Sequence, residues 1–543
     1  MEISSPDARL LMTPPRSDVE RIRTNLPTEL PDLSLDGQPT AVLESPPNPV
    51  LQRSLWRWAL ALALPVMVQQ FLALAVSLSD RFIAGRFLGM SEAQMLRYAE
   101  RYAQVLAWQT LPTGLGGTCV AANLVRQAEW ERHRVVAYQS AQTTAGYLSW
   151  FVSSFTVLVT VGATALVARH VGAGEYESAL RAMHQALNLA ALFGLAGTIL
   201  GYVGVEALVW ALQMRGLAAE YTAAYLRPIF LALSFQMIEA VGLACLAGAG
   251  DTVTGMWVLS GVALVNLPLS WAFCLGWGPF PELGFVGIAV GTACSHVLGC
   301  IAVLCVLARG RAGLRLQWHM FRPQRALMLR MLRVSVPAGV DSLSVVLWQL
   351  WFLSIVNGLG LVASAAHGIA IQWEALGYLS GGAFAAAAMT MVGQSLGAGS
   401  PQRARQAGWT AFALGGAVMC VMGAIFYMLA EPMFRLFCPY PEQEPIVRAG
   451  VPVLRLIAYA MPVLASCIIF TGALRGAGDT RVPVLFTWIG FLGVRIPLAY
   501  WFTGPSWQLG LLGAWYAMVI DLVVRGLAFL IRFARGRWHA CRV

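Results

Sequence analysis

The pentapeptide GAGDT occurs twice in this chain, at Gly248–Thr252 and again at Gly476–Thr480. The second copy follows the first at an offset of 228 (476 − 248), a little under half of the 543-residue chain. A phosphate loop, a metal site and a duplicated turn are the candidate explanations. A phosphate-binding loop would carry a lysine, which neither copy has. The pattern instead predicts a tight turn, in which glycine ends one helix in the left-handed conformation and Asp or Thr caps the next.

The composition is that of an integral membrane protein. Mean hydropathy is +0.64 and 12% of the residues are charged, against about 25% in soluble domains. The net charge of +10 comes from arginine without lysine. Arginines placed between apolar segments indicate membrane topology rather than a nucleic-acid partner. The ten cysteines form no Cys-x-x-Cys pair and most lie in apolar runs, which argues against a disulfide framework or a zinc site.

Twelve windows are apolar over the roughly 20 residues that a helix needs to cross a membrane. They are centred near residues 70, 157, 197, 236, 265, 297, 345, 380, 420, 460, 493 and 522. Arginines gather in the link after the sixth window and in the tail after the last: Arg309, Arg311, Arg315, Arg322, Arg325, Arg330, Arg532, Arg535, Arg537 and Arg542. Because positive loops stay cytoplasmic, we expect a multi-pass protein of the cell (inner) membrane with both termini in the cytoplasm. Residues 1–50, rich in proline, serine and acids, predict a disordered cytoplasmic tail.

The two halves repeat one another beyond GAGDT. Further anchors recur at offsets between 225 and 229: GAG at 172–174 and 397–399, Pro268 and Pro497, and LGFVG (283–287) and LGLLG (509–513). Pro65 and Pro337 differ by 272 instead (337 − 65), so the first half holds an insert near 90–137. We therefore expect an all-α membrane fold of two pseudo-symmetric six-helix lobes, at 51–320 and 321–543. An even number of spans in each half makes them parallel repeats, as some transporters have.

The motifs, taken in order, resemble the multidrug and toxic compound extrusion family. They are VSLSDRFIAGRFLG (76–89), the paired GAG loops, NLPLSWAF (266–273), LGFVGIAVGT (283–292) and ALRGAGDT (473–480). The resemblance implies a secondary transporter, not an enzyme, that exports organic cations or amphipathic small molecules by alternating access. Export would be driven by inward flow of protons or sodium, and no cofactor would be needed. Nothing in the sequence indicates an oligomer, so we expect a monomer.

The resemblance also implies a cation- or proton-binding cluster in the first lobe. Asp80 matches the family's aspartate, Asn266 its asparagine and Thr292 its threonine, while Ser270 stands where the family has a second aspartate. Asn266 and Ser270 are four residues apart and share a helix face. A sodium ion at Asp80 and Asn266 is possible, but with one carboxylate fewer we favour a proton, since a lone buried aspartate can take one up. The competing interpretation is that Asp80 only pairs with Arg81.

Three other acids within spans are candidate cavity residues, because a charge inside the membrane is costly unless it has a role or a partner. Glu239 either faces the cavity or is held by polar neighbours such as Gln236. Asp341 either replaces a family glutamate or satisfies backbone groups freed by Pro337. Glu374 is the best candidate in the second lobe.

Basic residues within the spans are few. Asp521 and Arg525 are four residues apart and predict an ion pair, and Arg495 needs an acidic partner that the sequence does not identify.

Two rival functions stay open. A membrane-embedded lipid-modifying enzyme would show clustered His and acidic motifs at one membrane face, which we do not find. A flippase for lipid-linked sugars or another lipid-like substrate shares the two-lobe architecture, but would carry several basic residues in its cavity.

Overall fold

The computed structural model describes residues 52–82, 151, 154–211 and 216–541. The expected tail at 1–50 and the expected insert at 90–137 lie outside these residues. Within the described ranges the fold is helical, apart from one isolated β-bridge between Arg311 and Leu314. Residues 48–543 group into one compact unit.

Twelve long helices in the described ranges cover the twelve predicted windows. In order they are α3 (Leu55–Phe82), the helix Ser154–Gly172, α6 (Tyr176–Ala211), α7 (Gly216–Gly248), α8 (Thr252–Leu275), α9 (Phe285–Arg309), α10 (Arg325–Asn357), α11 (Leu361–Gly397), α12 (Pro401–Met428), α14 (Glu444–Ala477), the continuous run α15–η4–α16 (Arg481–Trp488, Ile489–Arg495, Ile496–Thr503) and α17 (Gly510–Ala534). A short helix, α13 (Ala430–Phe437), joins α12 to α14. Eleven of these are long and apolar enough to cross a membrane, and α17 lies where the twelfth was predicted. The predicted all-α membrane fold is confirmed.

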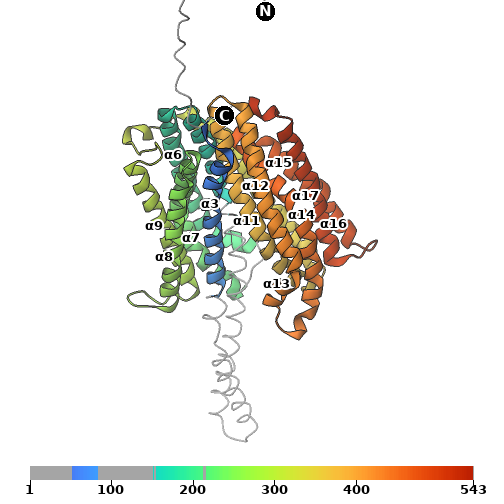
Figure 1. Ribbon diagram of the computed structural model, residues 1–543. Helices are drawn as coiled ribbons and strands as arrows, with labels where there is room; N and C mark the ends of the chain where they lie inside the picture. The colour runs from blue at the N-terminus through green and yellow to red at the C-terminus, as the bar shows by residue number, and fades with distance from the viewer. Residues whose placement is uncertain (1–51, 83–150, 152–153, 212–215, 542–543) are drawn as a thin grey trace, which may run out of the picture. The chain divides into compact units, whose positions relative to one another are not determined.

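The two halves pack their helices in the same pattern. In the first half α6 packs on α7, α7 on α9, and α8 on α9. In the second half the corresponding pairs are α12 with α14, α14 with α17, and α16 with α17. Figure 1 shows α6 to α9 in green and α12 to α17 in orange and red as two bundles. The duplication read from the sequence is therefore a duplication of helix packing, in two lobes.

The first helix of each half packs into the core of the other half. Trp58, Ala59, Leu62 and Ala63 of α3 belong to the hydrophobic core built mainly from α11 to α17. Conversely, Met331, Val334 and Ala338 of α10 belong to the core built from the helix 154–172 and α6 to α9. The two cores therefore share their first helices, and the lobe boundary at 320/321 stays a prediction.

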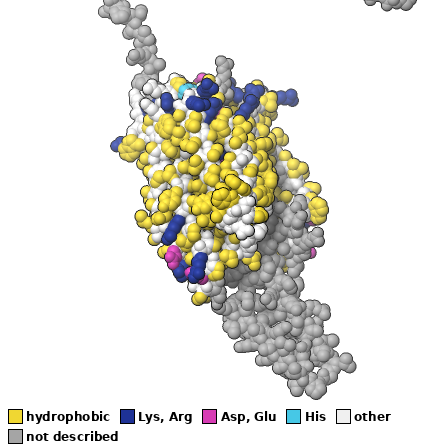
Figure 2. Space-filling model, turned by 90° about the vertical axis from the view of Figure 1, so that its right-hand side faces the viewer, with side chains coloured by type: hydrophobic (Ala, Val, Ile, Leu, Met, Phe, Trp, Pro, Cys, Tyr) yellow, Lys and Arg dark blue, Asp and Glu magenta, His cyan; other side chains and the backbone are white. Residues whose placement is uncertain are grey.

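One end of the molecule is rich in arginine, as Figure 2 shows in dark blue. We call it the arginine-rich end; it carries both GAGDT turns, both GAG turns and the described arginines among those predicted above, while Arg542 lies outside the described residues. The lobes meet here at very short range, because a Cβ atom on Gly172 would overlap the backbone of Gln394, and one on Gly397 would overlap the carbonyl of Arg169. Gly172 and Gly397, like Arg169 and Gln394, are related by the repeat offset of 225. The helix 154–172 and α11 thus cross at pseudo-equivalent glycines.

Hydrogen bonds add to this contact between the lobes. The Nε2 of Gln394 donates to the carbonyl of Gly248 (2.8 Å), and the hydroxyl of Thr390 donates to that of Ala247 (3.0 Å). The guanidinium of Arg169 donates to the carbonyl of Cys541 in the C-terminal tail (3.2 Å). Side chains of one lobe thus satisfy carbonyls at helix ends of the other.

Both GAGDT copies place glycine as predicted, but the predicted side-chain cap forms only in the first copy, since no side-chain hydrogen bond caps α15 after the second. Gly250 (φ 95°) and Gly478 (φ 89°) adopt positive φ angles, which favour glycine. Asp251 caps α8 by accepting from the backbone N–H of Thr254. Each aspartate also pairs with an arginine of its own lobe: Asp251 with Arg311 and Asp479 with Arg532, both at 2.7 Å. The motif is a structural turn that ties two helix ends together.

Candidate functional site

A cluster of neutral polar side chains lies between α8 and α9. The amide of Asn266 donates to the hydroxyl of Thr292 (3.1 Å), which in turn donates to the carbonyl of Ile288 (3.1 Å). The hydroxyl of Ser270 lies 3.4 Å from the amide oxygen of Asn266. Gly291 allows the close approach, because a Cβ there would touch Ser270. The three neutral residues expected to share a site do lie together.

Asp80 lies near the end of α3 and is 8% exposed; its Oδ1 atom is buried and receives no hydrogen bond from a described residue. Three turns earlier on α3, the Nε2 of Gln69 donates to the carbonyl of Thr252 (3.2 Å) and lies beside Gly255. Asp80 follows Gln69 by eleven positions, and Asn266 follows Gly255 by the same spacing. Eleven positions are about three helical turns, so each pair shares a helix face. Equal spacing along the two helices therefore predicts that Asp80 lies near the level of Asn266, although no hydrogen bond joins the two among the described residues.

The second lobe supports the same adjacency. The offset of 272 places Phe352 where Asp80 lies, and the offset of 229 places Arg495 where Asn266 lies. The guanidinium carbon of Arg495 lies 5.6 Å from the ring centroid of Phe352. The two counterparts therefore touch, although their chemistry is unlike that of the first lobe.

Arg495 belongs to a buried ion cluster with Asp521 and Arg525. Its Nη2 lies 2.7 Å from Oδ2 of Asp521, and Arg525 donates to both carboxylate oxygens of Asp521 (2.7 and 2.6 Å). The ring of Phe491 lies under both guanidinium groups, at 4.2 and 4.7 Å. The π-helical segment η4 ends at Arg495, and its residue Gly490 leaves room for the carboxylate of Asp521. The predicted pair of Asp521 and Arg525 is confirmed, and Asp521 is the partner that the sequence could not assign to Arg495.

Glu239 pairs with a histidine of a neighbouring helix. Its Oε2 lies 2.8 Å from Nδ1 of His296 on α9, while its buried Oε1 has no hydrogen-bond partner among the described residues. A Cβ on Gly299 would collide with the carboxylate. Glu239 therefore points at α9 within its own lobe, and its neighbour is His296 rather than Gln236.

Asp341 and Glu374 lie near each other in the second lobe but differ in their partners. Asp341 is buried and accepts from Nη2 of Arg475 on α14 (2.8 Å), not from backbone groups near Pro337. Glu374 is half-buried and has no hydrogen bond or ion pair with a described residue, although Arg495 acts on it electrostatically. Tyr378, one turn after Glu374, interacts electrostatically with Asp341, Glu374 and Arg475, yet its side chain is 52% exposed.

The sequence analysis did not single out Arg475, which lies so close to the GAGDT turn within ALRGAGDT that it reads as part of the turn. The side chain of Arg81 lies outside those described, so the alternative pairing with Asp80 is not addressed. Across residues 52–82, 154–211 and 216–541, no three His, Cys, Asp or Glu side chains converge as metal ligands would. The structure brings Asn266, Ser270 and Thr292 together, and the cation- or proton-binding role of this group with Asp80 stays a prediction.

Comparison with known proteins identifies the family. The family model described as MatE matches residues 133–272 and 337–501. The chain belongs to the MatE family. A probable multidrug resistance protein NorM of Thermotoga maritima is 29% identical over 394 residues, covering 72% of this chain and 83% of that protein. The multidrug resistance protein PmpM of Pseudomonas aeruginosa is 27% identical, covering 69% and 79%.

Solved structures share the fold of this MatE protein. One is described as the outward-facing conformation of a multidrug resistance MATE family transporter (TM-score 0.75, 18% identity, 91% of this chain and 99% of that one). Another is a MOP superfamily transporter from Pyrococcus furiosus (TM-score 0.75, 19% identity, 90% and 98%). At these identities the likeness shows the fold alone. Together with the family, it makes this chain a multi-pass membrane transporter and not an enzyme.

Proposed function

We propose that this MatE transporter exports cationic or amphipathic small molecules in exchange for protons, and that Asp80 is the group that carries the proton. The observation that carries the proposal is a buried carboxylate with one unpartnered oxygen among the described residues, in register with the cluster of Asn266, Ser270 and Thr292. A charge inside a membrane span is costly. A protonated Asp80 is neutral, so gain and loss of the proton change the stability of each state of the transporter.

A proton suits this cluster better than a sodium ion. A hard cation needs several oxygen ligands. Beside the carboxylate of Asp80 the site would supply only the neutral oxygens of Asn266, Ser270 and Thr292. Serine at position 270 also leaves Asp80 as the single carboxylate that matches the family site. A lone carboxylate needs only a proton to become neutral.

The second lobe does not take up a coupling ion at the equivalent place. Phe352 and Arg495 stand where Asp80 and Asn266 stand in the first lobe, so that position already holds a fixed positive charge. Arg495 is 2% exposed and paired with Asp521. We therefore assign one coupling proton to each transport cycle, bound in the first lobe.

The pairing of charged side chains in the second lobe favours a cationic substrate. Arg475, Arg495 and Arg525, inside the helices of the second lobe, are each bound to a carboxylate, so these three guanidinium groups are not free to hold a lipid phosphate as a flippase would require. Glu374 has no such partner among the described residues. It contributes, with the exposed ring of Tyr378, an acidic and aromatic surface suited to organic cations. The curated relatives are named multidrug resistance proteins, in keeping with this cargo.

The arginine-rich end faces the cytoplasm of the inner membrane in this proposal, as positive loops do. The lobes touch there through Gly172, Gly397 and Gln394. This state is therefore closed toward the cytoplasm, and substrate would leave on the opposite side. We also propose that the transporter acts as a monomer.

Transport by reconstituted full-length protein tests the proposal. An imposed proton gradient should drive uptake of a fluorescent organic cation into liposomes, and a sodium gradient at equal pH should not. Driving by sodium alone would overturn proton coupling. Transport of a lipid-linked sugar, with no movement of the dye under either gradient, would favour the flippase instead.

A further inference from the structure

A cavity outside the proposed transport site opens at the arginine-rich end. It has a volume of about 520 Å³ and lies beside the first three turns of α12, where Leu55 of α3 approaches. Its lining consists of Leu55, Gln402, Arg405, Gln406, Trp409 and Thr410. It is an open surface groove, because Gln402, Arg405 and Gln406 are exposed.

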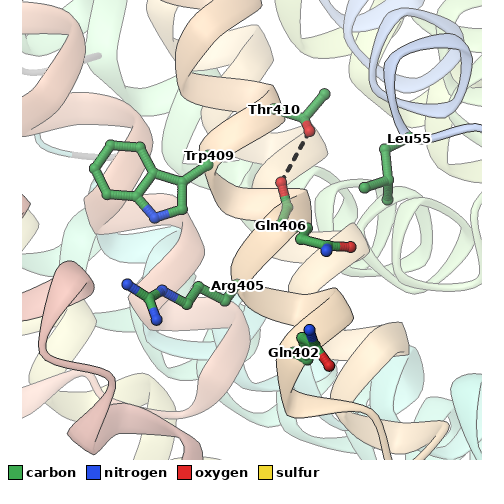
Figure 3. A pocket seen from close by; sticks show the side chains of 6 residues that line it. All are labelled: Leu55, Gln402, Arg405, Gln406, Trp409 and Thr410. Carbon is green, nitrogen blue, oxygen red and sulfur yellow. Dashed lines mark hydrogen bonds between the residues drawn. The ribbon is translucent and has the colours of Figure 1, made fainter.

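The cavity offers hydrogen-bond donors that the protein itself does not use. No described acid forms a salt bridge with Arg405, whereas Arg435 and Arg448, at the opposite end of the molecule, pair with glutamates. Figure 3 shows the indole nitrogen of Trp409 on the edge of the ring that faces Arg405, one turn away. The amides of Gln402 and Gln406 lie on the same stretch of helix. The cavity is therefore a positively charged, donor-rich site.

The same cavity has an apolar wall held in place by packing. The Trp409 ring makes edge contacts with Phe412, Phe470 and Phe533, with centroids 5.2 to 6.0 Å apart. The side chain of Leu55 lies at the other edge of the site, beside Thr410 and Gln406 (Figure 3). A ligand here would meet donors on one side and hydrocarbon on the other.

The level of this site relative to the membrane indicates which kind of ligand it would meet. With 28 residues, α12 is about 42 Å long at 1.5 Å per residue, longer than the roughly 30 Å hydrocarbon core. With the excess shared between its two ends, the first turn of α12 lies at the level of the lipid headgroups. Basic pockets between helices at this depth bind anionic headgroups.

We propose that this cavity binds the headgroup of an anionic phospholipid. The phosphate accepts from the guanidinium of Arg405 and the indole N–H of Trp409, the glutamine amides reach the glycerol region, and the acyl chains run along Leu55. The bound lipid fills the space between the starts of α3 and α12. This inference does not depend on the transport mechanism proposed above.

Native mass spectrometry of the full-length protein in detergent tests the site. With equal amounts of phosphatidylglycerol and phosphatidylcholine, the wild type should retain one phosphatidylglycerol in preference. Arg405→Gln should weaken that retention about fivefold, in line with the loss of one basic contact. Arg435→Gln, at an exposed arginine of the opposite end, should leave it unchanged. Equal retention by wild type and Arg405→Gln would overturn the proposal.

A second measurement identifies the occupant. A photoreactive benzoylphenylalanine replacing Gln402 should form an adduct with phosphatidylglycerol when the full-length protein is irradiated in vesicles that contain it. An adduct with a peptide from residues 1–51 instead would overturn the proposal, because the cavity would then bind the chain's own tail. Displacement of the lipid by millimolar inorganic phosphate would also overturn it, since the site would recognise phosphate without needing a lipid.

Discussion

Asp521 is a single carboxylate held between two guanidinium groups, deep in the second lobe. Removing the negative charge by Asp521→Asn would leave two buried arginines without a counter-charge. Because an uncompensated buried charge costs about 3–5 kcal/mol, we expect a loss of that order in stability. Arg495→Gln leaves the neutral pair of Asp521 and Arg525 and should cost less.

The stability losses of the two variants can be compared by thermal unfolding in detergent, monitored through tryptophan fluorescence. Arg435→Gln is the control, because that arginine is 54% exposed and exposed pairs contribute about 0–1 kcal/mol. A larger loss of stability for Arg495→Gln than for Asp521→Asn would contradict this account, in which the cost follows the number of buried charges left unpaired.

At this scale the sequence predicts contacts along one helix but not those between helices. The pair of Asp521 and Arg525, and the shared face of Asn266 and Ser270, follow from a spacing of four residues. The bond from Arg495 to Asp521 and the pair of Glu239 with His296 depend on which helices pack together. No local spacing encodes that packing.

Among the helices, the crossing of α11 with the helix 154–172 depends on glycine. Gly397→Ala would place a methyl group against the backbone of Arg169 and force the two lobes apart at the arginine-rich end. The carbonyl of Cys541 is bound by Arg169 at this contact. We therefore expect faster alkylation of the Cys541 thiol in this variant, measured by mass spectrometry.

Gly382→Ala is the matched control for that experiment. It lies on the same helix, and an added Cβ would meet no atom within 4 Å. An equal alkylation rate at Cys541 in Gly397→Ala, Gly382→Ala and the wild type would show that the close crossing does not hold the lobes together.

The turn that precedes α8 makes the stability of the folded protein depend on pH. Burial alone would raise the pKa of Asp251, but hydrogen bonds from Thr254 and Arg311 outweigh it and lower the pKa below its ordinary value of 3.8. A lowered folded-state pKa adds stability above the ordinary value, and this is lost as pH falls through the folded-state pKa. The stability difference between wild type and Asp251→Asn should thus be present at pH 7 and shrink by pH 3, in thermal melts. A difference that stays constant would contradict this role.

At the level of elements, the GAGDT turns could be predicted because glycine and aspartate act locally. The sharing of α3 and α10 between the two cores could not, since an apolar helix face suits either core equally well. The π-helical segment before Arg495 has no sequence signal that we can name.

Taken as a whole, the molecule is a duplicated bundle whose halves agree in packing and differ in chemistry. The duplication, the twelve helices and the family were all readable from repeated motifs. The difference in residue type was readable too, since the repeat offsets place Phe352 and Arg495 opposite Asp80 and Asn266, but the contact between Phe352 and Arg495 and the pairing of Arg495 with Asp521 were not. We propose that this difference restricts coupling to the first lobe.

Proton release on substrate binding is the most direct test of that claim. Binding of an organic cation to the wild-type protein in weakly buffered detergent solution, near the pH at which Asp80 is protonated, should release about one proton, read with a pH indicator. Asp80→Asn should still bind the cation and release none, while Glu374→Gln should still release the proton. Release of the same number of protons by Asp80→Asn and by the wild type would contradict the account.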